Sequence, residues 1–167
     1  MPVTYESLAT TTLGTAAATI DFNSISSAYT DLRVVIVEIG VTAADVLIRF
    51  NSSSTGYSAT RMRGNGTNVT VQNDLSASYL RFDNVGSSTT VPTLKTADIF
   101  SYSNSSNYKS VLLISNWDVA GGTSSNGVYY TVGAWANNSA ITSVNILRAS
   151  GNFNVGTTAT LYGIKAA

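Results

Sequence analysis

The chain has 167 residues with nine basic and nine acidic side chains, so its net charge is zero, and only 11 % of its residues are charged. It contains neither cysteine nor histidine, which excludes disulfides, Cys/His zinc sites, thiol nucleophiles and His-based catalytic triads. The basic residues are scattered singly and form no cluster of the kind that binds nucleic-acid phosphates. Two interpretations of the low charge remain open: a surface covered by partners, or an uncharged polar surface of the extracellular type.

Residues 1–14 alternate polar and apolar side chains and precede the first apolar run. This segment either adds an edge strand to the domain or extends onto a neighbouring subunit by strand addition. In the second case its candidate contacts are Val3, Tyr5 and Leu8. The segment lacks the basic and apolar regions of a signal peptide, and no apolar run approaches the roughly 20 residues that cross a bilayer.

Residues 15–167 are expected to form a single antiparallel two-sheet β-sandwich, because short apolar runs recur between clusters of Gly, Asn and Ser. Many strands without helices favour a jelly-roll-like arrangement. Residues 31–39 are apolar on both alternating faces, which fits a strand covered on both sides or one that meets a neighbouring subunit. The predicted strands are residues 15–22, 31–39, 44–50, 109–119, 127–136, 141–148 and 158–165.

Arg61 and Arg63 lie two residues apart on a further predicted strand, so they share one face and Met62 lies on the other. A turn is predicted at Gly64-Asn65-Gly66. Two like charges in line on a strand are expected to avoid a dry core. Three interpretations remain: an exposed polar face, a contact with another protein subunit, or capture of a ligand.

The acidic residues do not indicate an enzyme. A glycosidase needs two carboxyl groups about 5–10 Å apart, and nothing in the spacing of Asp83, Asp98 and Asp118 requires such a pair. No D-x-D-x-D-G calcium loop is present. We therefore predict a protein without catalytic residues, cofactor or metal ion.

The aromatic residues permit an alternative, glycan binding through Tyr129, Tyr130 and Trp135. Tyr129 and Tyr130 are adjacent on a predicted strand, so one is expected in the core and the other on the surface. Trp117 and Trp135 lie within apolar runs, which predicts burial for both.

Three segments carry a resemblance to a known family: ATIDFNSISSAYTDLRV at 18–34, RFNSSSTGYSATRMRGNG at 49–66, and ITSVNILRASGNFNVGTTATLYGIK at 141–165. Together they resemble small phage virion proteins and the end domains of phage tail fibres. The ending LYGIK is the most distinctive part, and the motifs are structural rather than catalytic. The resemblance implies a β-sandwich virion component that self-associates, often as a homotrimer.

Within that family, the resemblance implies a capsid decoration (cement) protein that stabilises the shell by bridging capsid subunits. The alternative is a host-receptor or glycan-binding domain of a tail fibre or head spike. A chain that begins at Met1 without a fibrous shaft favours decoration. The expected partners are the major capsid protein and further copies of this chain, with no nucleic acid or membrane. The expected location is the capsid surface, after synthesis in the host cytoplasm without a signal peptide.

Overall fold

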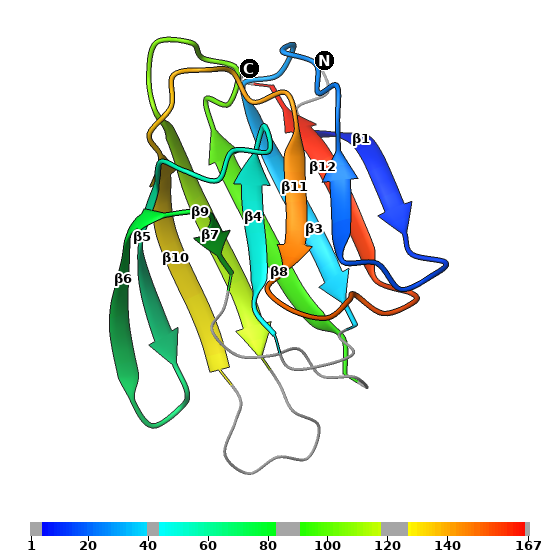
Figure 1. Cartoon of the computed structure of the whole chain (residues 1–167), viewed down its shortest axis with the longest axis vertical. Coiled ribbons are helices and arrows are strands. Elements are labelled where there is room, and N and C mark those ends of the chain that lie inside the picture. The colour runs from blue at the N-terminus through cyan, green and yellow to red at the C-terminus, as the bar shows by residue number, and fades with distance from the viewer. Residues whose placement is uncertain (1–4, 40–43, 83–90, 118–126, 166–167) are drawn as a thin grey trace.

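The computed structural model describes residues 5–39, 44–82, 91–117 and 127–165 and confirms an all-β, two-sheet antiparallel sandwich (Figure 1). The larger sheet has eight strands in the order β1-β12-β3-β8-β9-β10-β5-β6, and the smaller has the order β2-β11-β4-β7. The strands are β1 (Tyr5–Thr12), β2 (Thr19–Phe22), β3 (Asp31–Glu38), β4 (Val46–Phe50), β5 (Tyr57–Gly64), β6 (Val69–Ala77), β7 (Leu80–Arg81), β8 (Thr93–Phe100), β9 (Lys109–Trp117), β10 (Gly127–Trp135), β11 (Val144–Arg148) and β12 (Thr158–Ile164).

The strand order is that of a jelly roll with two additional pairs of strands. When β5–β6 and β9–β10 are set aside, the other eight strands form two four-stranded sheets in the jelly-roll order, β1-β12-β3-β8 opposite β2-β11-β4-β7. The two additional pairs extend the larger sheet from β8 outward. We call β9, β10, β5 and β6 the wing; its β5–β6 end projects past the smaller sheet in Figure 1.

Alternation along the strands separates an inner from an outer face. In β3, the side chains of Leu32, Val34 and Ile36 are fully buried against the smaller sheet. The intervening residues point outward, and Val37 is 42 % exposed. Of the two interpretations of residues 31–39, coverage on both faces within this chain is therefore wrong, and the outer face is open.

Residues 5–12 form the edge strand β1, which pairs with β12, so the first of the two arrangements considered for the N-terminal segment is present. The expected strand at 141–148 begins only at Val144. The preceding residues are held by Asn51, whose side-chain oxygen accepts hydrogen bonds from the backbone N–H groups of Thr142 and Ser143. The predicted turn after β5 is confirmed, with Gly66 at a φ of 83°.

The two motifs YTDL and LYGIK are parts of one contact. The ring of Tyr29 lies on Gly163 so closely that a Cβ atom there would be 2.5 Å from ring carbons. The backbone N–H of Thr30 donates to the carbonyl of Ile164 at 2.8 Å, and the ammonium of Lys165 lies 5.3 Å from the Tyr29 ring centroid. The tyrosine hydroxyl donates to Glu6 at 2.8 Å. Tyr29 therefore holds together Glu6 and Gly163, which lie near the two ends of the described chain.

A buried ion cluster connects the two sheets. Glu38 of β3 is fully buried and lies 3.1 Å from the ammonium of Lys95 on β8. Its other oxygen accepts a hydrogen bond from the guanidinium of Arg148, which belongs to β11 of the smaller sheet. Because a buried charge is costly unless it is paired, the three side chains depend on one another.

Lys109 is a further buried cation, at the start of β9. Its ammonium donates to the carbonyl oxygens of Asn104, Asn107 and Asn138 at 2.5, 2.8 and 3.4 Å. Burial lowers the pKa of this lysine. The contacts tie two loops, 101–108 and 136–143, to the sheet.

We predict that Gly163→Ala lowers the free energy of unfolding by about 1–3 kcal/mol, because the added methyl group displaces the Tyr29 ring. Urea unfolding of the two proteins measures the difference. Gly14→Ala is the matched control, since nothing lies within 4 Å of a Cβ at that position. Equal stability of Gly163→Ala and wild type would show that the ring contact is not tight.

We predict that Glu38→Gln lowers the free energy of unfolding by about 3–5 kcal/mol, because it leaves two buried cations without their shared carboxylate. Urea unfolding is again the measurement. A triple replacement, Glu38→Leu with Lys95→Met and Arg148→Met, is expected to recover most of the loss. A single variant as stable as wild type would contradict the role given to this cluster.

Candidate protein-interaction surface

The outer face of the larger sheet is the widest regular surface of the described structure. Strand register aligns its outward side chains in rows that run from one edge of the sheet to the other. One complete row consists of Thr10, Thr160, Val35, Thr96, Ile114, Tyr130, Met62 and Val71. Every strand of the sheet therefore contributes to this one face.

The outer face is almost uncharged. Among the described residues of the eight strands, its charged side chains are Asp31, Arg33 and Asp98, all on β3 and β8. Arg33 and Asp98 form two parallel hydrogen bonds of 2.5 and 2.9 Å, and this contact raises the pKa of Arg33. The charges of this pair cancel, and the carboxylate of Asp31 accepts a hydrogen bond from the backbone N–H of Ser101, so a partner would meet a nearly neutral surface.

The two halves of the face differ in chemistry. On β1 and β12, threonine hydroxyls pair across the strands, Thr10 with Thr160 at 3.0 Å and Thr12 with Thr158 at 3.1 Å. The wing instead exposes apolar side chains, among them Leu75 at 77 % and Val132 at 64 % exposure. Its other exposed apolar residues are Met62, Val69, Val71, Val128 and Tyr130.

Of the predicted interface residues in the N-terminal segment, Tyr5 lies on this outer face and stacks on Tyr162 with ring centroids 4.6 Å apart. Leu8 is half-buried and packs against the core instead. Val3 lies outside the described residues.

Arg61 and Arg63 share a face, as predicted, but it is the inner one. Arg61 is only 5 % exposed, and its guanidinium pairs with Asp74 of β6 at 2.9 Å. The expectation that both arginines point to water or to a partner is therefore wrong for Arg61. Asp74 on the next strand supplies a carboxylate that makes burial possible, a cross-strand pairing that spacing along one strand does not reveal. Met62, on the opposite face, is the exposed residue.

Arg63 is half-buried, with its guanidinium carbon 5.7 Å from the ring centroid of Tyr129. A space of only about 40 Å³ lies between these two residues, Arg61, Thr70 and Gln72. That volume is close to that of one water molecule, so a sugar ring does not fit there.

The aromatic predictions are confirmed where they can be compared. Tyr129 is buried and Tyr130 is 44 % exposed on the outer face, and Trp135 is buried against Tyr57. Tyr129, Tyr130 and Trp135 therefore share no open surface and do not form the stacking platform considered for a glycan. The side chain of Trp117 lies outside the described part of the structure.

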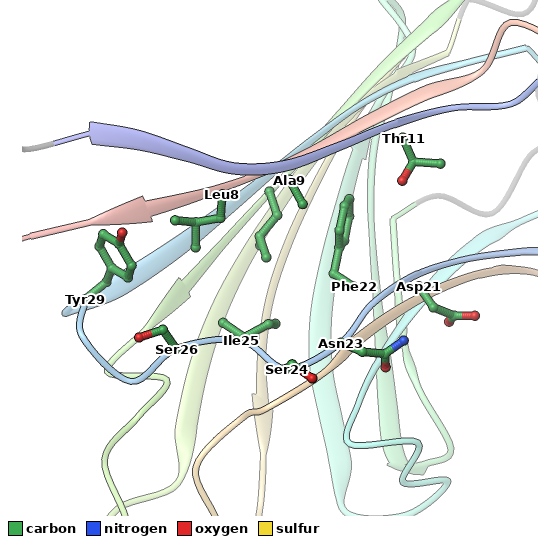
Figure 2. A pocket seen from close by; sticks show the side chains of 11 residues that line it. Leu8, Ala9, Thr11, Asp21, Phe22, Asn23, Ser24, Ile25, Ser26 and Tyr29 are labelled. Carbon is green, nitrogen blue, oxygen red and sulfur yellow. The ribbon is translucent and has the colours of Figure 1, made fainter.

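A cleft of about 360 Å³ opens between the edge strands β1 and β2 (Figure 2). Leu8 from one sheet and Phe22 and Ile25 from the other side point toward one another across it. The polar side chains that line it belong to Thr11, Asp21, Asn23, Ser24, Ser26 and Tyr29. Asp21 is its one carboxylate among the described lining residues, so the cleft lacks the pair of acids that a glycosidase uses.

Of the three acidic candidates, Asp98 alone lies within the described residues. Asp98 pairs with Arg33, whereas Asp83 and Asp118 lie outside the described residues. No group of three or more potential metal ligands occurs in the described ranges. No helix in them is long and apolar enough to cross a membrane.

Comparisons with protein-family models, with curated proteins and with solved structures found no match.

We predict that Asp74→Asn lowers the free energy of unfolding by about 1–3 kcal/mol, because it weakens a charge-assisted hydrogen bond to the buried Arg61. Thermal or urea unfolding reports the loss. Thr67→Ala, in the exposed turn after β5, is the control and is expected to change little. If Asp74→Asn is as stable as wild type, the ion pair does not contribute to the fold.

Proposed function

We propose that the protein is a non-enzymatic structural component of a bacteriophage virion, a decoration protein that stabilises the capsid by bridging major capsid subunits. The observation that carries this proposal is the continuous, nearly uncharged outer face of the larger sheet. It is joined by the resemblance of three segments to phage virion proteins. Such a face binds another protein by burial and hydrogen bonding rather than by charge.

The size of the face suits this role. Eight strands about 4.8 Å apart, each about eight residues long, cover on the order of 1,000 Å². A stable protein interface buries about 800 Å² on each partner. The face is therefore large enough for one standard interface or for two smaller ones that share it.

We assign the shell contact to the part of the face formed by β1 and β12, which we call the threonine half. Rows of hydroxyls such as those of Thr12, Thr158 and Thr160 offer hydrogen bonds to a protein surface without requiring countercharges. Because few charges take part, salt has little effect on such a contact. Several copies held together would convert weak single contacts into tight attachment.

Binding to the assembled shell alone accounts for stabilisation without catalysis. A ligand that binds the intact particle but not its separated subunits raises particle stability by mass action. No active-site chemistry is needed for this function.

The cleft between β1 and β2 favours the second candidate, a host-receptor or glycan-binding domain of a tail fibre or head spike. Its polar lining and its volume of about 360 Å³ suit one sugar unit better than the buried aromatic residues do. Under this alternative, Asp21→Ala with Asn23→Ala would abolish binding to host cells.

The proposal predicts that the purified protein binds empty capsids assembled without it and raises their disruption temperature. Thr160→Lys is expected to weaken this binding at least tenfold, because it places a charge in the contact. Thr67→Lys, in an exposed turn, is the matched control and should bind like wild type. Co-sedimentation with capsids measures both.

Wild-type protein that neither binds nor stabilises the capsids would overturn the decoration role. Normal capsid binding by Thr160→Lys would show that the threonine half is not the contact.

A further inference from the structure

We propose that the wing is a self-association surface, on which the apolar outer faces of β9, β10, β5 and β6 from two copies of this chain pack against each other. The inference rests on the proposed function, in which several copies of the chain attach to the capsid together. It assigns that self-association to named residues.

The register gathers the apolar residues of the wing into one patch. Tyr130 of β10 lies between Ile114 of β9 and Met62 of β5, and Met62 pairs in turn with Val71 of β6. Val132 lies on the same face of β10, two residues further on. The four strands place no charged residue on this face among the described positions. A monomer rarely leaves a contiguous apolar patch of more than a few hundred Å² uncovered.

The patch contains both a projecting side chain, Leu75, and a hollow. Ser58, Ser110 and Ala134 are in register on neighbouring strands, and their small side chains form the floor of a hollow of about 350 Å³. Leu75 and Val132 stand at its edge, both largely exposed. The pairing of β5 with β6 is irregular beside Ser58, and Ser76 has a φ of 53°, which sets Leu75 out from the sheet. Leu75 of one copy fits the hollow of another.

Two arguments make a second copy the occupant. A charged partner surface would lose hydration against this patch without gaining a countercharge, whereas another wing is equally uncharged. The copies also carry zero net charge, so no long-range repulsion opposes their approach.

The area agrees with this assignment. Four strands of about eight residues cover roughly 500 Å² per copy, or about 1,000 Å² in total, which reaches the usual minimum for a specific interface. Sheet faces of this kind pack about 10 Å apart, as the two layers of a sandwich do.

Sedimentation equilibrium of the full chain, without capsids, tests the inference. Wild type is expected to form a dimer, and Val132→Lys to raise the dissociation constant at least tenfold. Thr160→Lys, on the same face but outside the wing, is the matched control and should associate like wild type. Because Val132 is exposed, Val132→Lys should retain the wild-type urea unfolding midpoint of the monomer.

Disulfide trapping provides a second measurement, since the chain has no cysteine of its own. Under mild oxidation Val132→Cys is expected to cross-link two copies, and Thr160→Cys is not. A wild type that is monomeric at all concentrations would overturn the inference. So would equal association of Val132→Lys and wild type.

The two proposals fail separately. Monomeric protein that still stabilises capsids would overturn the wing contact and leave the decoration role. Protein that self-associates but does not bind capsids would overturn the decoration role and leave the wing contact standing. Monomeric protein whose capsid binding is abolished by Val132→Lys would show that the wing faces the shell instead, and this also overturns the inference.

Discussion

The carboxylate of Glu38, held between Lys95 and Arg148, is the interaction on which the sandwich most depends. It joins strands of both sheets inside the sandwich, whose core is mainly apolar. Lys109 and Arg61 are buried as well, each with its own oxygen partners. A chain with few charges thus places several of them inside, where pairing and hydrogen bonding offset the loss of hydration. The outer face is correspondingly neutral.

The larger sheet contains four strands of the jelly roll and the two additional strand pairs. On their inner faces, β3 and β8 as well as β9, β10 and β5 pack against the core, to which the wing contributes Leu113, Trp135 and Tyr57. The outer face of the wing is not needed for this packing. Apolar residues there cannot be explained by packing within the chain. The same sheet therefore supplies both the scaffold and the surface proposed for association, without a separate binding domain.

Alternation was sufficient to predict the fold class, the central strand at residues 31–39 and the opposite orientations of Tyr129 and Tyr130. It failed where inward positions carry charge. In β8 the inward residues include Thr93 and Lys95, so the strand lacks an apolar run although both are buried. Burial of Arg61 depends on Asp74 of the neighbouring strand. Such pairings are set by register between strands, which a single run of residues does not contain.

The position of β12 between β1 and β3 has a consequence for synthesis of the protein. Residues 158–164 form the second strand from this edge of the sheet, and Tyr5 pairs with Ile164. The first strand therefore has no partner in the sheet until residues 158–164 have left the ribosome. Contacts between residues so distant in sequence form slowly, so the backbone edge of β1 stays unpaired until then. The charge of Glu6 and the irregular register between Ser7 and Ala9 are features of β1 that oppose its pairing with another chain.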